Sequence, residues 1–321
     1  MLWLEADRMG FLLPTLTQQA LDNQRDVVKN ERRQRYENQP YGLAWLRLTE
    51  TLFPTEHPYH RSVIGSHEDL SAASLDDVRQ FFQEHYGAAN AVLTISGSFG
   101  AIETRQLVER YFGNIPAGQR TATPQVSQPS LERIEHVVLP DQVKLPRVYL
   151  AWHTPALFAQ GDAELDLFAA ALSHGKTSRL YKPLIYDKKL AQSVDAFQVS
   201  LGLSGFFVVQ ATAAPGVDAE TLARALVEEL KAATHAPLSG AEFERSLNRY
   251  TKGFYSRLES VLERARLLST YYHFTGKADY VQQDLQRYLT ASPEGVQQAA
   301  QRWLTLDRYA RIDIVPPGTD P

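Results

Sequence analysis

The chain has 321 residues, enough for about two domains at the usual ~150 residues each. Its composition, 44% hydrophobic and 22% charged, excludes a disordered or low-complexity protein. A net charge of −4 argues against a nucleic-acid binder, and zero cysteines exclude disulfides, thiol nucleophiles and cysteine-based metal sites. No stretch approaches the roughly 20 apolar residues that span a bilayer.

The first part of the chain is predicted to be mainly helical. Met1 leads directly into an amphipathic helix, with no signal-peptide pattern, so we expect the first part of a natural domain to be missing. Turn and capping residues then separate further elements. The predicted helices cover 18–37, 43–53, 75–86 and 102–112, and a buried strand is predicted at 91–96.

The second part alternates strands and helices without strict β-α-β order, which favours an α+β fold. The polar, Pro-, Ser- and Thr-rich stretch at 114–131 is typical of a linker. We therefore place a first domain at 1–120, a linker at 121–132 and a second domain at 133–321. Predicted strands cover 134–139, 146–153, 192–200, 205–213 and 311–315, and predicted helices cover 161–173, 177–186, 218–234, 240–273 and 291–304.

Most short motifs indicate no chemistry. Residues 174–177, His-Gly-Lys-Thr, lack the first glycine of a phosphate-binding loop. His57 and His60 lie beside Glu56 and could hold a metal, but Pro58 between them favours an ordinary extended turn. Neither H-E-x-x-H nor H-x-x-E-H occurs in the chain.

One stretch is distinctive: L-D-N-Q-R-D-V-V-K-N-E-R-R at 21–33. Further motifs follow in order along the chain: H-P-Y at 57–59, V-I-G-S at 63–66, Y-F-G-N-I-P at 111–116 and V-Y-L-A-W-H-T-P at 148–155. With these motifs the sequence resembles the pitrilysin/insulinase family of inverted-motif zinc peptidases, which includes the mitochondrial processing peptidase. It is most similar to the short bacterial members that work as two subunits. The resemblance implies two related α+β domains, each a mostly antiparallel sheet packed with helices, the first incomplete here.

The resemblance also implies a role for Glu31 as the third zinc ligand. Gln24, two turns earlier on the same helix face, is a candidate supporting residue for that site. The family's H-x-x-E-H supplies two histidines and the general base, and it would lie upstream of Met1. We therefore expect no catalytic residue in this chain, weak or absent zinc binding, and no activity of the chain alone. Without the resemblance, Glu31 would be interpreted as a solvated helix glutamate.

The family's second domain carries an Arg/Tyr pair that grips the substrate backbone. Here Ile185 and Gln192 occupy those positions, whereas the nearby Arg179 and Tyr181 match a structural element. In two-subunit members the partner subunit supplies the pair, so the resemblance implies such a partner. No substrate-binding residue of this chain is assigned.

The resemblance thus predicts a zinc-dependent endopeptidase subunit that cleaves peptides or unfolded segments in a closed chamber. The alternative is a non-catalytic scaffold or peptide-binding subunit. The expected location is the periplasm, with the cytoplasm as the other possibility.

Overall fold

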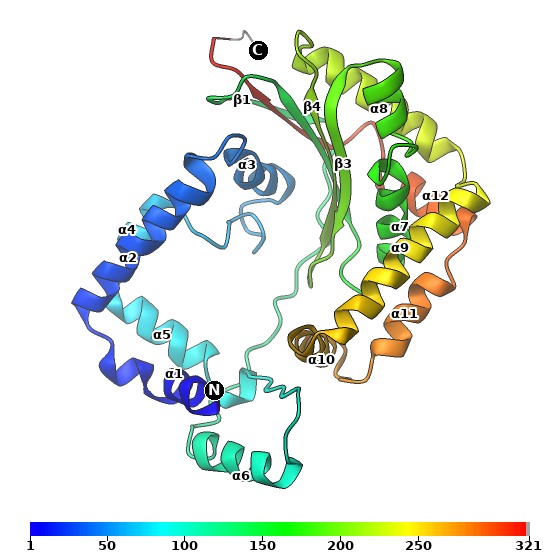
Figure 1. The fold of residues 1–321 in the computed structure, drawn as a ribbon. Helices are drawn as coiled ribbons and strands as arrows, with labels where there is room; N and C mark the ends of the chain where they lie inside the picture. Colours follow the sequence, from blue (N-terminus) through cyan, green and yellow to red (C-terminus); the bar gives the residue numbers. More distant parts are fainter. Residues whose placement is uncertain (319–321) are drawn as a thin grey trace. The chain divides into compact units, whose positions relative to one another are not determined.

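The computed structural model describes residues 1–318, which form two compact units interleaved along the chain (Figure 1). Unit 1 contains residues 1–34, 63–125 and 257–280, and unit 2 contains 35–62, 126–256 and 281–318. Residues 35–62, before the predicted linker, belong to unit 2, and residues 257–280, after it, belong to unit 1. The two units therefore differ from the two domains predicted from the sequence. The linker at 121–132 itself stays a prediction.

Unit 2 is built on one five-stranded sheet. Its strands are β1 (Glu135–Pro140), β2 (Arg147–Thr154), β3 (Ala191–Val199), β4 (Gly205–Ala213) and β5 (Ala310–Val315), in the order β1-β5-β2-β4-β3. Only the β1–β5 pair is parallel, and the other three pairs are antiparallel. The mostly antiparallel sheet predicted for this domain is confirmed, and each predicted strand lies within about a residue of the observed one.

Helices cover one face of this sheet (Figure 1). The layer contains α7 (Asp162–Ser173), α8 (Ala219–His235), α9 (Gly240–Glu259), α11 (Val281–Leu289) and α12 (Pro293–Trp303), with a π-helical turn, η3, at Lys182–Asp187. Its core joins the inward sheet residues Leu150, Trp152 and Phe207 to Leu165 and Leu226 of the helices. The predicted helix 240–273 is divided at Ser260, whose side chain caps α10 (Val261–Thr275).

A single helix, α3 (Leu43–Leu52), covers the opposite face of the sheet. Ala44, Leu48 and Leu52 recur at four-residue spacing, so they share one side of the helix. That side packs on Tyr149 and Phe206 in a second hydrophobic cluster. Because β2 and β4 are covered on both faces, their sequences are almost continuously apolar, as expected of a strand buried on both sides.

The regular secondary structure of unit 1 is all helical in the described residues. It contains α1 (Leu2–Thr15), α2 (Gln18–Arg32), α4 (His67–Ala72), α5 (Leu75–His85), α6 (Ala101–Phe112) and α10, with a single 3-10 turn, η2, at Ala88–Asn90. α2 continues into a π-helical turn, η1, at Arg33–Glu37, so the predicted helix 18–37 is confirmed. Ser74 forms a full capping box with Asp77 at the start of α5.

The predicted buried strand at 91–96 is wrong for this structure. These residues form no ladder with another described strand, and Val92 and Leu93 are exposed. A strand needs a neighbour for its N–H and C=O groups, and every described strand belongs to the sheet of unit 2. This segment contacts α10 instead, where the Thr94 and Ser269 hydroxyls lie 2.7 Å apart.

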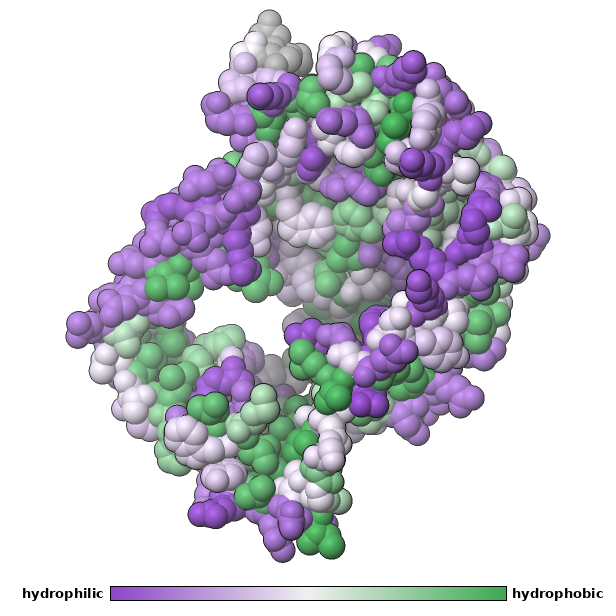
Figure 2. Space-filling view, viewed as in Figure 1, coloured by the Kyte–Doolittle hydropathy of each residue, from purple (hydrophilic) through white to green (hydrophobic). Residues whose placement is uncertain are grey.

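Large apolar side chains remain at the surface of unit 1. Trp3 is 57% exposed, Phe99 49% and Ile102 77%. Figure 2 shows hydrophobic groups at the surface in the region of α1, α5 and α6. Apolar surface of this extent is typical of a contact surface for other polypeptide. Separately, no helix within residues 1–318 is both long and apolar enough to cross a membrane.

Candidate metal and substrate residues

The helix that carries Glu31 is firmly attached within unit 1. Thr17 caps α2 by accepting a hydrogen bond from the Ala20 amide at 3.2 Å. Arg25 donates to the Ala73 carbonyl at 2.8 Å, and Arg32 donates to the Gly65 carbonyl at 2.6 Å. Charge-assisted bonds of this length hold the middle and the C-terminal end of the helix in a defined position. Glu31 therefore lies on a positioned last turn of α2.

Glu31 is half-buried and Gln24 is exposed on the same helix. Across residues 1–318, no group of three His, Cys, Asp or Glu side chains lies close enough to hold a metal ion. Protein zinc sites use at least three such ligands. The donor set of the described residues therefore does not fit zinc by itself.

His57 and His60, the other candidate metal ligands, serve the packing of the loop after α3. The ring of His57 is 5% exposed, stacks on Phe53 at 4.7 Å, and accepts a hydrogen bond from the Tyr59 amide at its Nδ1 atom. The Nδ1 atom of His60 lies 2.7 Å from the Phe53 carbonyl oxygen. Burial lowers the pKa of His57, which keeps the imidazole neutral.

A third histidine, His153, joins this packing; it lies within the V-Y-L-A-W-H-T-P motif at 148–155, but the sequence predicted no role for it. Its Nε2 atom lies 2.6 Å from the Leu52 carbonyl oxygen, and its ring meets the edge of Phe53 at 5.3 Å. Burial is the main reason that its pKa falls to about 4. His153 is thus a neutral donor that ties β2 to the end of α3.

The resemblance places Ile185 and Gln192 at the positions of the family's Arg/Tyr pair. Ile185 packs against the core from η3, and Gln192 is an exposed residue of β3. Arg179 is structural, as the resemblance implied: it binds Glu242 through both ends of its guanidinium, at 2.8 and 2.9 Å. It also donates to three carbonyls at the end of α8 and in the loop that follows. Tyr181 packs against the core.

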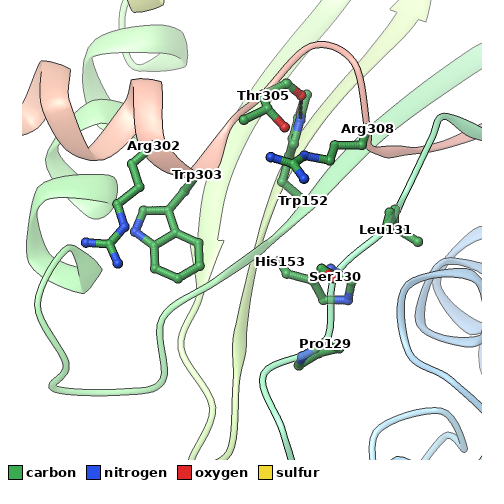
Figure 3. Close-up of a pocket in the computed structure, with 9 residues that line it drawn as sticks. All are labelled: Pro129, Ser130, Leu131, Trp152, His153, Arg302, Trp303, Thr305 and Arg308. Carbon is green, nitrogen blue, oxygen red and sulfur yellow. Dashed lines mark hydrogen bonds between the residues drawn. The ribbon is translucent and has the colours of Figure 1, made fainter.

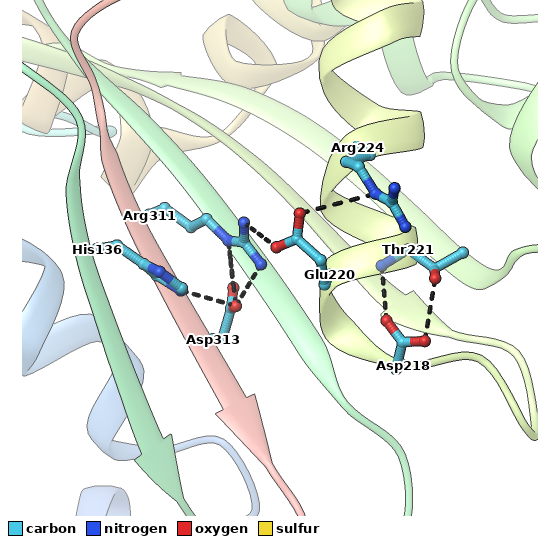
Figure 4. Close-up of polar contacts among 7 residues, drawn as sticks. All are labelled: His136, Asp218, Glu220, Thr221, Arg224, Arg311 and Asp313. Atoms are coloured by element: carbon cyan, nitrogen blue, oxygen red, sulfur yellow. Dashed lines mark hydrogen bonds and ion pairs between the residues drawn. The ribbon is translucent and has the colours of Figure 1, made fainter. Parts of the chain in front are cut away.

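A charged network at β5 contains a histidine–aspartate pair (Figure 4). Asp313 is 2% exposed, accepts from Arg311 at 2.6 Å and lies 2.9 Å from Nε2 of His136. Arg311 also donates to Glu220 of α8 at 2.7 Å. The nearby Thr221 hydroxyl donates to an aspartate at its own helix cap. The pair therefore has no nucleophile in the network drawn, and its role is to join β1, β5 and α8.

Comparison with known proteins decides the family. A model described as the peptidase M16 inactive domain matches residues 72–250, more than half of the chain. The chain belongs to the peptidase M16 family. The predicted pitrilysin-type membership is confirmed by this match.

Relatives of the chain carry the name zinc protease. A zinc protease, PqqE, from Helicobacter pylori is 29% identical over 288 residues, which cover 88% of this chain and 64% of that protein. An uncharacterized zinc protease, YmxG, from Bacillus subtilis is 21% identical over 97% of this chain and 74% of the relative. The chain thus spans less than two thirds of the Helicobacter pylori relative.

Solved M16 structures share the fold. The crystal structure of a protease from Helicobacter pylori matches with a TM-score of 0.87 and 26% identity, covering 98% of this chain and 76% of that one. A peptidase M16 inactive domain from Pseudomonas fluorescens matches with a TM-score of 0.84 at 17% identity, over 100% of this chain and 75% of that one. The second likeness shows the fold alone, and together they confirm the predicted α+β fold.

Proposed function

We propose that the chain is part of a zinc-dependent endopeptidase subunit of the M16 family that cleaves peptides or unfolded segments inside a closed chamber. The match to the M16 family over residues 72–250 carries this proposal, and the relatives named zinc proteases support the metal. In this proposal Glu31 supplies one zinc ligand from a helix whose middle and C-terminal end are held by Arg25 and Arg32. The remaining ligands and the general base come from an H-x-x-E-H region that the chain does not contain.

The exposed surface of unit 1 supports the proposal that further polypeptide completes this unit. The extended segment at 91–96 has no strand partner among the described residues, and apolar side chains such as Trp3 and Phe99 are exposed. An added strand would satisfy the backbone of this segment and cover part of that surface. In the same proposal, a second M16 subunit supplies the Arg/Tyr pair that Ile185 and Gln192 replace, and both subunits work in the periplasm.

The experiment begins with the gene upstream of Met1. If it encodes H-x-x-E-H in frame, the extended protein is purified and its zinc content is measured for the wild type and for Glu31→Gln. Asp26→Asn is the matched control, since Asp26 is an exposed acidic residue on the same helix. We expect about one zinc per chain in the wild type and in Asp26→Asn, and strong loss in Glu31→Gln. Zinc content that ignores Glu31→Gln contradicts the assignment.

The second candidate function is a non-catalytic scaffold or peptide-binding subunit. Two observations favour it: the matching family model describes an inactive domain, and residues 1–318 hold no three-ligand metal group. An in-frame stop codon just upstream of Met1 would support this function over the peptidase. A peptide-binding subunit would then be expected to bind unfolded peptides without cleaving them.

A further inference from the structure

The side chain of His57, in the loop after α3, fits its site only while its ring is neutral. Its Nδ1 atom accepts a hydrogen bond from the Tyr59 amide at 3.1 Å, so the single proton of the neutral ring is on Nε2. That Nε2 atom is buried and has no hydrogen-bond partner among residues 1–318. A second proton, on Nδ1, would set two N–H groups against each other and break the bond to Tyr59. The charged ring would then be buried without an acceptor.

His153, on β2, packs beside the same loop and is also held in a neutral form. Its Nε2 atom donates to the Leu52 carbonyl at 2.6 Å, so the lone pair of the neutral ring is on Nδ1. Both histidine rings pack on Phe53, with ring centroids 4.7 Å away for His57 and 5.3 Å away for His153. Positive charges on both rings would repel each other in this buried site.

The charged groups around the two rings compensate little for a proton. A pocket of about 170 Å³ lies beside His153, and the charged residues that line it, Arg302 and Arg308, are both cations (Figure 3). Glu56 favours the charged form of His57, but burial is the larger effect and lowers the pKa of that histidine. Burial also lowers the pKa of His153 to about 4, and the charge of His57 lowers it further.

The other hydrogen bonds of this loop do not require a neutral histidine. His60 donates from Nδ1 to the Phe53 carbonyl at 2.7 Å, a bond that its ring can keep in either charge state. The Tyr59 hydroxyl accepts from the Leu203 amide at 3.0 Å. His57 and His153 are therefore the two groups through which acid would act on the loop.

We propose that residues 54–62 form an acid-sensitive loop, which is packed while His57 and His153 are neutral and opens when they take up protons. The opening is local, because the apolar cluster between α3 and the sheet does not depend on either charge. Residue 62 is the last of this segment of unit 2, and the chain continues into unit 1 at residue 63. Opening therefore lengthens the free chain that joins the two units. The inference uses no part of the proposed peptidase function.

The test is hydrogen exchange of the full chain at about pH 8 and about pH 5, with each rate divided by the intrinsic exchange rate at that pH. The Tyr59 and His60 amides report on the loop, since both donate to atoms of His57. A pKa of about 4 for His153 in the packed loop, against 6.5 in the open one, makes opening about 30-fold more frequent at pH 5. His57 adds to this effect, so protection should fall at least that much, while the amides of β4 keep theirs.

Two substitutions keep the neutral hydrogen bonds but remove the titration. His57→Asn places an amide oxygen near the position of Nδ1, and His153→Gln places an amide nitrogen near the position of Nε2. In the double variant the protection of the loop should change less than about threefold between the two pH values. The control is His235→Gln, an exposed histidine at the end of α8, which should behave as the wild type does.

Three results would overturn the proposal: a fall in wild-type loop protection below about threefold, an equal fall in the double variant, or an equal loss of protection in β4. The last result would mean that acid unfolds the sheet together with the loop. If the double variant does not fold, His57→Asn alone decides, because it should lessen the fall and an undiminished fall contradicts the role of His57. The zinc experiment measures metal content, so its failure leaves this comparison unaffected.

Discussion

The contact between Arg179 and Glu242 should be one of the most stability-critical polar contacts of unit 2. The two side chains are only 15% and 20% exposed and share two hydrogen bonds, and Arg179 adds bonds to three backbone carbonyls. The change to test is Arg179→Met, which keeps most of the volume and removes every donor. It leaves a largely buried carboxylate without its cation, so we expect a loss of about 3–5 kcal/mol in the free energy of unfolding.

The pH dependence gives this prediction a second, independent measure. The hydrogen bond from Arg179 is the main reason that the pKa of Glu242 falls to about 2 from its usual 4.5. That difference corresponds to at most about 3 kcal/mol of stability. Because the pKa is lowered by folding, this contribution is present above about pH 4.5 and is lost as the pH falls toward about 2. The difference in the free energy of unfolding between wild type and Arg179→Met should therefore decrease across that pH range.

The assay is urea unfolding followed by circular dichroism at several pH values between 7 and about 2.5. The control is Arg133→Met, which removes the 2.8 Å ion pair between Arg133 and Glu135. Both side chains of this pair are exposed. It should change stability little, since water and salt screen exposed pairs. A loss below about 1 kcal/mol for Arg179→Met, or a gap that stays constant down to about pH 2.5, would refute the reasoning.

Three further predictions concern unit 2. Because folding lowers the pKa of His153 to about 4, the wild type should lose stability as the pH falls from about 6.5 toward 4, and His153→Gln should lessen that loss in urea titrations. Tyr288→Phe removes a 2.7 Å hydrogen bond to Asp166 while keeping the stacked ring, so unfolding should become easier by about 1–3 kcal/mol; an unchanged midpoint would contradict this role. In Gly205→Ala the new Cβ would lie 2.5 Å from a backbone carbonyl oxygen, at a cost of about 1–3 kcal/mol, whereas Gly253→Ala meets open space inside α9 and should stabilise by about 0.5–1 kcal/mol in thermal unfolding.

The sequence by itself determined the elements whose causes are local. Capping side chains lie at the starts of α2 and α5: Ser74 caps α5 as the sequence predicted, and of the two candidates Thr15 and Thr17 the structure uses Thr17 for α2. Apolar runs identified all five strands of unit 2, since β-branched and aromatic residues suit a buried sheet. The motif at 21–33 and those after it determined the M16 family, because such motifs depend on residue identity and order alone.

Only the tertiary structure showed which of these elements pack or pair with one another. The sequence predicted a strand at 91–96 from its apolar residues, but a strand also requires a neighbour, and the described residues provide none. Composition placed residues 43–53 with the first domain, whereas α3 buries one side on the sheet of unit 2. His153 acquired its role from the Leu52 carbonyl, 101 residues away in the chain. Such pairings depend on non-local packing, which local sequence patterns do not encode.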